Sequence, residues 1–243
     1  MSGWMEDLEK LNKLRNDNLI SEEEYEIEKA ALLPSIANSP DSKPTYNLGG
    51  LGKAISILAV ISSIMGLLSL IAFANRASVI NDIKNGTYVS WADIDNADTF
   101  VGVSTIFEIL IGIPLAIILI IWAWRAAGNL EAWGKSGRWS RGWAIGGWFC
   151  PIMFFFVPYQ VISDAWKNAL SSDSGQQRNN LWLAGFVVWW IGYALNVIGS
   201  MIGTDTIDDA IAGDVIYAAS GVTTIAAGIL IAIAFNQMSK RHT

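Results

Sequence analysis

Residues 100–124 read FVGVSTIFEILIGIPLAIILIIWAW and contain one charged side chain, that of Glu108. A helix needs about 20 mostly apolar residues to cross a bilayer, so this stretch predicts a transmembrane helix. Three further stretches have similar length and character: 51–75, 181–203 and 215–236. The last is rich in Gly, Ala and Ser, which allow helices to approach closely in lipid. We therefore predict an all-α fold, a polytopic membrane bundle of four spanning helices.

The composition of the whole chain agrees with a membrane protein. Its 243 residues are 52% hydrophobic and 16% charged, against about 25% charged residues in an ordinary soluble domain. Twelve tryptophans and a mean hydropathy of +0.37 point the same way. These values exclude a disordered chain, and an isoelectric point near 4.8 argues against a nucleic-acid partner. The single cysteine, Cys150, cannot form an internal disulfide.

The charged residues between the apolar stretches indicate an orientation. Segments 76–99 and 204–214 together carry eight acids and two bases, whereas segment 125–180 carries six bases. Lys240 and Arg241 follow the last apolar stretch. Because cytoplasmic loops carry an excess of Lys and Arg, we predict that both termini and segment 125–180 are cytoplasmic.

A fifth apolar stretch, 142–163, is interrupted by Pro151 and Pro158, and each proline removes a helical hydrogen-bond donor. If this stretch crossed the membrane, its basic flanks would lie on opposite sides. We therefore predict a re-entrant or interfacial broken helix, which keeps every basic cluster on one side. Five full spans remain the alternative.

The N-terminal residues 1–33 carry nine acids and four bases, and so account for −5 of the net charge of −6. Leu8, Leu11 and Leu14 recur every three residues, which indicates one apolar helix face. Ser21 and Glu24 have the spacing of a capping box at the start of a second helix. We predict a helical hairpin over 1–33 that ends before Pro34, a Pro/Ser/Gly-rich linker over 34–50, and a membrane domain over 51–243.

The hairpin resembles a known module. Residues LEKL at 8–11, NLISEEEY at 18–25 and KAALL at 29–33 are similar to the SHOCT (short C-terminal) domain. Thirty residues are too few for a self-sufficient core, so we expect the hairpin to form a homo-oligomer or to dock on a protein partner. The expected contact residues are Leu8, Leu11, Leu14, Ile20, Tyr25 and Leu32.

A second resemblance lies in the middle of the chain. Residues WAWRAAGNL at 122–130, GRWSRGWAIGGWFCPI at 137–152, PYQVI at 158–162 and AW at 165–166 resemble domain of unknown function 4328, a bacterial multi-pass membrane family. The resemblance implies a location in the bacterial inner (cytoplasmic) membrane and implies no activity. One departure is clear: where the family often has a small residue and then Asn, this chain has Met153 and Phe154.

Glu108 is the one acid well inside a predicted span, and an intramembrane acid indicates a functional site by default. It lies about 12 Å below the outer edge, at 1.5 Å per helical residue. Polar residues at similar depth on the other spans suggest a polar layer; they are Ser69, Asn196, Ser200, Ser220, Thr223 and Thr224. The layer could bind a proton, a cation or a small solute, or it could hold the helices together.

Arg125 and Asn129 are four residues apart and share a helix face at the cytoplasmic end of the second span. Arg125 could clamp the re-entrant element or contact lipid phosphate, and we favour the clamp.

No catalytic, cofactor-binding or metal-binding set is evident in the sequence. The only histidine is His242, next to the C-terminus, and no nucleophile–base pair or phosphate-binding loop stands out. We therefore expect a non-enzymatic membrane protein without a cofactor that self-associates or recruits a partner through residues 1–33. The alternative is a small channel or transporter that uses Glu108 and the broken 142–163 element. An intramembrane enzyme is the least favoured hypothesis.

Overall fold

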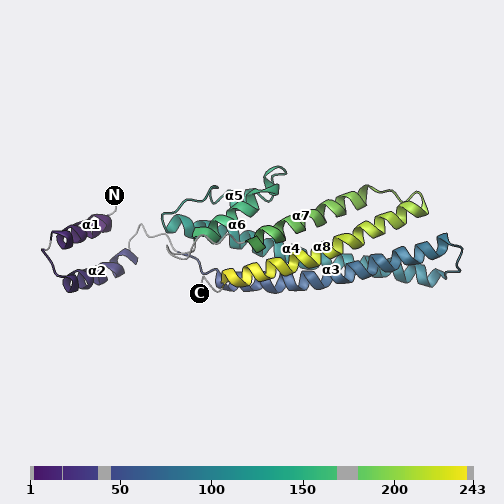
Figure 1. The fold of residues 1–243 in the computed structure, drawn as a ribbon, viewed down its shortest axis with the longest axis horizontal. Coiled ribbons are helices and arrows are strands. Elements are labelled where there is room, and N and C mark those ends of the chain that lie inside the picture. Colours follow the sequence, from purple (N-terminus) through teal and green to yellow (C-terminus); the bar gives the residue numbers. More distant parts are fainter. Residues whose placement is uncertain (1–2, 18, 38–44, 169–179, 240–243) are drawn as a thin grey trace. The chain divides into compact units, whose positions relative to one another are not determined.

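The computed structural model describes residues 3–17, 19–37, 45–168 and 180–239, and all regular elements in them are helices (Figure 1). The chain divides into two compact units. One contains residues 1–45 with 131–134, and the other contains 46–130 with 135–243. Each unit is described by itself below.

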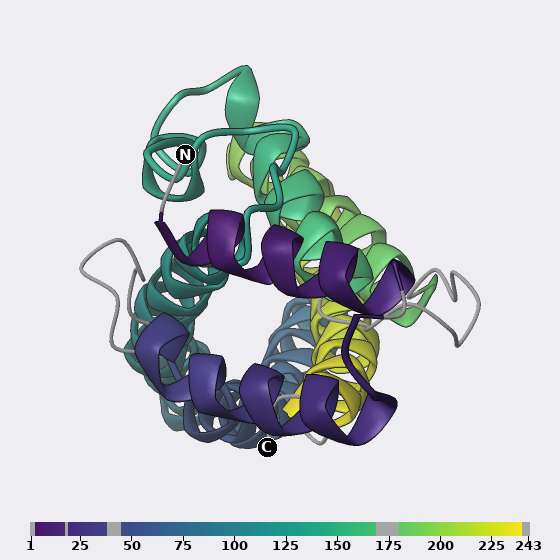
Figure 2. The same ribbon diagram turned by 90° about the vertical axis from the view of Figure 1, so that its left-hand side faces the viewer.

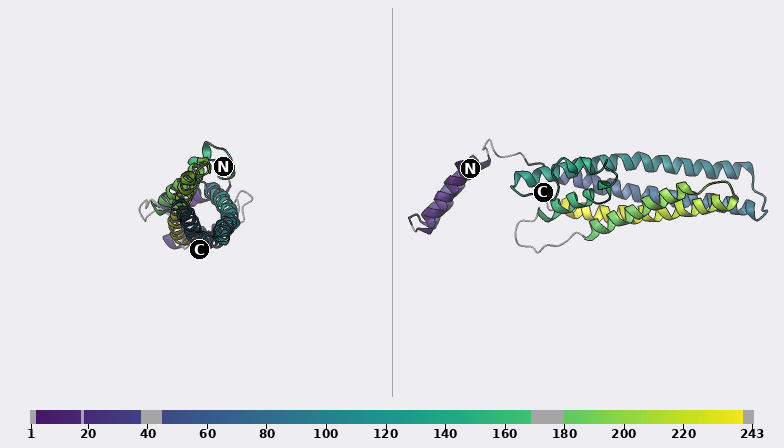
Figure 3. Two further views of the ribbon diagram at one scale, coloured as in Figure 1. Left: turned by 90° about the vertical axis from the view of Figure 1, so that its right-hand side faces the viewer. Right: turned by 90° about the horizontal axis from the view of Figure 1, so that it is seen from above.

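Four long helices form the body of the second unit: α3 (Gly49–Lys84), α4 (Trp91–Ala132), α7 (Asn180–Met201) and α8 (Ile207–Ser239). Each is long and apolar enough to cross a membrane, which confirms the predicted four-helix architecture. Seen end-on, they surround a common axis, with α8 between α3 and α7 (Figures 2 and 3). We name the ends of this bundle by residues that lie there. The Tyr46 end is where α3 and α7 begin, and the Arg76 end is where they finish.

Contact between α3 and α8 depends on residues without large side chains. A Cβ atom added to Gly221 of α8 would lie 2.7 Å from the backbone oxygen of Gly66 on α3. One added to Gly228 would lie 2.5 Å from the backbone oxygen of Ala59. Ser63 Oγ also donates a hydrogen bond across the interface to the Ile225 carbonyl, at 3.2 Å. The two backbones are therefore as close as glycine permits, in the way that membrane helices use small residues.

The opposite side of α8 packs against α7 through three glycines spaced seven residues apart, Gly185, Gly192 and Gly199. A Cβ atom at Gly199 would lie 3.1 Å from the ring of Tyr217, and one at Gly192 would lie 2.4 Å from Thr223 Oγ1. A spacing of seven keeps all three glycines on one helix face. Helix α8 therefore packs closely against α3 on one side and against α7 on the other.

Helix α4 packs differently, because it has no extensive close backbone contact with α3, α7 or α8 in the described residues. It meets them through side chains and leaves many large apolar residues uncovered. Examples are Ile106, Leu110, Ile113 and Ile117. These side chains form a face suited to lipid.

Segment 142–163 is not one helix. It contains the single turn α5 (Trp143–Gly146), the 3-10 turn η1 (Met153–Phe155) and the first half of α6 (Val157–Asn168). Pro158 is the second residue of α6, where the missing N–H has no helical partner to lose. These short elements lie at the Tyr46 end of the bundle (Figure 1). Segment 142–163 therefore does not form a fifth long spanning helix, the alternative that we considered.

The core of the second unit also lies at the Tyr46 end. Trp122 of α4, Trp182 of α7 and Phe235 of α8 are almost completely buried. Both tryptophan rings meet the Phe235 ring edge to face, at centroid distances of 5.1 and 5.6 Å. Aromatic packing of this kind fixes the mutual angle of three helices.

The N-terminal unit contains α1 (Gly3–Asn16) and α2 (Glu22–Ala37). The predicted capping box is confirmed: Ser21 N donates to Glu24 Oε2 at 2.9 Å, and Glu24 N donates to Ser21 Oγ at 3.2 Å. The hydrogen bond from the Ser21 backbone lowers the pKa of the Glu24 carboxyl below its usual range.

Our prediction that the second helix ends before Pro34 is wrong, because α2 continues to Ala37 and contains this proline within its last turns. The remainder of the predicted linker is described only from residue 45, and α3 already begins at Gly49. Residues 38–44, Arg178, Lys240, Arg241 and His242 lie outside the described residues.

Candidate functional site

The amide of Asn129 holds the backbone of Tyr46, which precedes α3. Tyr46 N donates to Asn129 Oδ1 at 2.6 Å, and Asn129 Nδ2 donates to the Tyr46 carbonyl at 2.8 Å. Asn129 lies near the end of α4 and is buried. The side-chain amide pairs with both the N–H and the C=O of residue 46, as the backbone of a neighbouring β-strand would do. It thereby connects the start of α3 to the end of α4.

Arg141, in the segment after α4, completes this arrangement. Its Nη2 donates to Tyr46 Oη at 3.0 Å, and its guanidinium carbon lies 3.5 Å from the centre of the Trp124 ring. A Cβ atom at Gly128 would lie 2.9 Å from that carbon, so a larger residue at this position would require the arginine side chain to move. We call Tyr46, Trp124, Arg125, Gly128, Asn129 and Arg141 the Tyr46 cluster.

Arg125 lies beside the ring of Tyr46. Its guanidinium carbon lies 5.7 Å from the centre of the Tyr46 ring, and it makes no hydrogen bond or ion pair in the described part of the chain. Of the predicted pair Arg125 and Asn129, therefore, only Asn129 clamps by hydrogen bonds, and what it clamps is residue 46.

The segment after α4 is attached to α6 by a second set of polar contacts. Arg138 donates through its backbone N–H and its guanidinium to Asp164, with Nη2 2.8 Å from Oδ1 and Nε 3.0 Å from the same atom. Trp139 Nε1 donates to Gln160 Oε1 at 2.7 Å. The hydrogen bonds from Arg138 to Asp164 raise the pKa of this arginine further above its usual range, so the guanidinium stays charged.

Arg138, Trp139 and Gln160 belong to the stretches of sequence that resemble domain of unknown function 4328. A family model described as Domain of unknown function (DUF4328) matches residues 85–240, more than half of the chain. The chain belongs to this family. No curated protein and no solved structure showed a significant match. Tyr46 and α3 precede the matched DUF4328 domain, so the Asn129–Tyr46 contact joins this domain to the part of the chain before it.

Phe154, where the family often has Asn, lies in an aromatic cluster within the DUF4328 domain. Its ring meets Trp190 at 4.9 Å, Trp189 at 5.6 Å and Trp148 at 6.1 Å, mostly in edge-to-face geometry. The aromatic ring therefore attaches η1 to α7 by packing.

The predicted polar layer divides into separate groups. Glu108 is half-buried and approaches Ser69 on α3, although Ser69 Oγ is buried without a hydrogen bond of normal geometry in the described residues. Asn196, Thr223 and Thr224 line a separate cavity of about 150 Å³ between α7 and α8. The structure does not bring Glu108 to that cavity.

Most hydroxyls of the predicted layer bond to their own helix. Thr223 and Thr224 both donate to the Ser220 carbonyl, at 2.7 and 3.1 Å, and Ser220 Oγ donates to the Tyr217 carbonyl. Ser200 is exposed and donates to the Val197 carbonyl, and Asn196 donates to Gly192. These groups satisfy themselves locally.

A second, apolar cavity of about 160 Å³ lies between α4 and the pair α7 and α8. Its aromatic wall comes from Trp148, Trp182, Phe186 and Trp189, and Gly112 and Gly228 line it elsewhere. A mostly apolar cavity of this size is large enough for a benzene-sized group. It lies where α4 stands apart from its neighbours.

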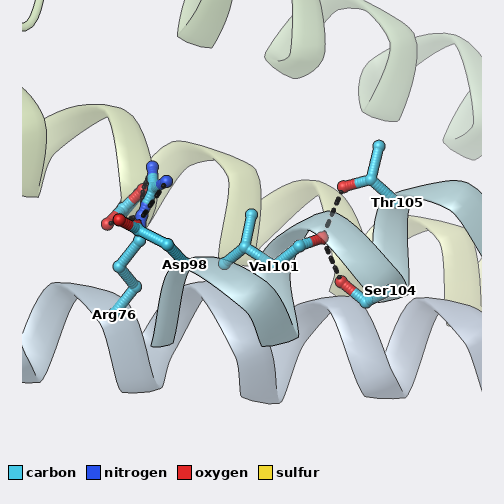
Figure 4. A network of polar contacts seen from close by, with 6 residues as sticks. Arg76, Asp98, Val101, Ser104 and Thr105 are labelled. Carbon is cyan, nitrogen blue, oxygen red and sulfur yellow. Dashed lines mark hydrogen bonds and ion pairs between the residues drawn. The ribbon is translucent and has the colours of Figure 1, made fainter. Parts of the chain in front are cut away.

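Sequence reasoning missed the main polar contact at the Arg76 end. Arg76 of α3 donates through Nε to both carboxylate oxygens of Asp214 on α8, at 3.1 and 3.0 Å, and its Nη1 lies 3.5 Å from Asp98 Oδ1 on α4 (Figure 4). Asp214 is 1% exposed. The sequence signal for this contact was Asp214, an acidic residue at the end of the predicted loop 204–214, which we counted as part of that loop. Arg76 therefore connects three helices.

In the N-terminal unit, two of the six predicted contact residues are used within the hairpin. Leu11 and Tyr25 are buried, and Tyr25 Oη donates to Asn12 Oδ1 at 2.9 Å. Leu8, Ile20 and Leu32 are half-buried, and Leu14 is exposed. Leu19 and Ile27, which we did not select, are exposed large apolar residues.

The Asn129 clamp gives a prediction with a matched control. Replacing Asn129 by Ala leaves the half-buried N–H and C=O of Tyr46 without these partners, so we expect a loss of about 2 kcal/mol in stability. Asn196→Ala removes an exposed amide that bonds only its own helix, and we expect a change of at most about 0.5 kcal/mol. Thermal unfolding of the full chain in detergent measures both. Equal losses for the two variants would contradict the role of Asn129.

Proposed function

We propose that the protein is a non-enzymatic membrane protein that self-associates through its N-terminal hairpin. The observation that carries the proposal is the set of exposed apolar side chains on α1, α2 and the turn between them. Leu14, Leu19 and Ile27 are 39%, 69% and 63% exposed. Among the hairpin side chains whose burial the structure describes, Leu11 and Tyr25 are the buried apolar ones. A unit of about thirty residues is too small to be stable alone.

A second copy of the hairpin is the simplest surface that would cover these residues. The resemblance of the hairpin to the SHOCT module supports this role, because its motif residues are those that form the capped two-helix unit. The apolar helices of the DUF4328 domain and of α3 would place the hairpins of neighbouring copies at the same membrane surface, which raises their effective concentration.

The proposed setting is the bacterial inner membrane, with both termini in the cytoplasm, as the basic residues of segment 125–180 favour. We also propose that α5, η1 and α6 form a re-entrant or interfacial element. Their shortness and their position at one end of the bundle support this. Hydrogen bonds from Arg138 N to Asp164 and from Arg138 Nη2 to the Gln160 carbonyl would satisfy backbone polar groups there.

Deleting residues 1–33 tests self-association. We expect light scattering in detergent to give a multiple of the 26.5 kDa chain mass for the wild type and a single-chain mass for the deletion. The double variant L14S/I27S should act like the deletion, because it removes two uncovered apolar side chains. Glu28→Ser, on the exposed surface of α2, is the matched control and should keep the wild-type mass. A monomeric wild type in both detergent and lipid nanodiscs would contradict the proposal.

A second candidate function, a small channel or transporter, is favoured by one observation. Glu108 approaches Ser69, whose buried Oγ makes no hydrogen bond of normal geometry in the described residues. An acid and an unsatisfied hydroxyl within a span are suited to pass a proton or bind a cation.

Proton flux in proteoliposomes tests this candidate. If Glu108 carries protons, the wild type should dissipate an imposed pH gradient and Glu108→Gln should do so at least tenfold more slowly. Ser200→Ala, an exposed hydroxyl bonded to its own helix, should leave the flux unchanged. Wild-type flux no greater than that of empty vesicles would exclude the proton path.

A further inference from the structure

The described membrane domain contains four arginines, and they fall into two pairs. Arg76 and Arg138 each donate several hydrogen bonds to a buried aspartate, Asp214 and Asp164 respectively. Arg125 and Arg141 have no acidic partner in the part of the chain that the structure describes. The fold therefore neutralises two of its arginines and leaves the other two charged and uncompensated.

The two uncompensated arginines lie close to one aromatic ring. The guanidinium carbons of Arg125 and Arg141 are 5.7 and 5.2 Å from the centre of the Tyr46 ring. Both side chains are half-buried. Two like charges that are partly withdrawn from water repel each other and lose hydration, so an anion between or beside them would be stabilising.

The place of this pair along the chain indicates what kind of anion it meets. Arg125 directly follows the apolar run 100–124 of α4, and Trp124 precedes it. Tryptophan and arginine at the end of a spanning helix lie at the level of lipid headgroups. The pair is therefore positioned at the depth of the phosphate layer, on a helix whose apolar face is suited to lipid.

Neighbouring residues fix the position of Arg141 and, in the described part of the chain, leave the hydrogen-bond donors of Arg125 unoccupied. Asn129 fixes the backbone of Tyr46, Gly128 makes room for Arg141, and Tyr46 Oη accepts a hydrogen bond from Arg141 Nη2. All the donors of Arg125 remain available within the described residues. A guanidinium offers two parallel donors that match two phosphate oxygens.

We propose that Arg125 and Arg141 bind the phosphate of an anionic phospholipid headgroup at the Tyr46 end of the bundle. Arg125 makes the main contact, and Arg141, held by Tyr46, contributes the second positive charge. The site selects anionic lipids over zwitterionic ones because only the former bring a net negative charge to the two arginines.

The test uses the full chain purified in detergent. It is titrated with mixed micelles that contain phosphatidylglycerol or phosphatidylcholine and, separately, with dissolved inorganic phosphate. Lipid adducts are counted by native mass spectrometry, and thermal unfolding is followed in parallel. For the wild type we expect phosphatidylglycerol to bind about tenfold more tightly than phosphatidylcholine, as one charge-assisted contact provides. Inorganic phosphate should give no comparable stabilisation, because it lacks the acyl chains that hold the headgroup at the membrane surface.

Arg125→Gln should abolish most of this preference, and Arg125→Lys should retain part of it, since lysine keeps the charge without the paired donors. Lys53→Gln removes one exposed charge near the start of α3 and is the matched control, with an expected change below twofold. Because Arg125 makes no hydrogen bond within the described residues, R125Q should unfold without lipid at the wild-type temperature.

Three results would overturn the proposal: equal binding of the two lipids by the wild type, the same stabilisation by free phosphate, or equal effects of R125Q and K53Q. If R125Q itself is unstable, the comparison of R125K with the wild type decides, since retained full preference in R125K would also contradict paired-donor recognition.

Discussion

The close approach of α8 to both α3 and α7 is the constraint on which the rest of the bundle depends. Lipid supplies no hydrophobic force between helices, so their association relies on van der Waals contact over short distances. Gly66, Gly221 and Gly228 allow that contact on one side of α8, and the seven-residue series that ends at Gly199 allows it on the other. The resulting three-helix layer is the most closely packed part of the membrane domain.

Helix α4 is attached to this layer by the buried packing of Trp122 against Phe235 and by polar contacts at its two ends. At the Arg76 end, the guanidinium of Arg76 lies between Asp214 and Asp98. At the Tyr46 end, Asn129 holds the residue that leads into α3. Between these points α4 meets its neighbours only through side chains, and the apolar cavity lies there. Helix α4 is thus held to its neighbours by polar contacts at both ends, with a cavity beside it between those ends.

The sequence was sufficient for the long elements because a spanning helix is specified by length and apolar composition alone. The four spans, the broken character of 142–163 and the Ser21–Glu24 capping box all followed from local patterns. The contact between Asn129 and Tyr46 did not, because its partners are 83 residues apart and the second lies in a stretch with the composition of a linker.

The candidate polar layer shows a second limit, which is geometric. Counting residues from the membrane surface gives the depth of a side chain but not its direction around the helix axis. Asn196 and Ser200 have the depth of Glu108 and yet are exposed on α7, while Ser69 faces it. The direction was fixed by the glycine faces of α7 and α8, which the sequence displays as a seven-residue spacing that we did not use.

The central claim, that glycine faces bring α8 to within backbone distance of its neighbours, can be tested by disulfide cross-linking. A Cβ atom at Gly192 would lie 3.4 Å from Thr223 Cβ, close to the separation in native disulfides. In a Cys150→Ser background, G192C/T223C should cross-link almost completely on mild oxidation in membranes. The control G102C/T223C, in which Gly102 has no neighbour within 4 Å, should not. Absence of the first cross-link, or equal yields for the two pairs, would contradict the account.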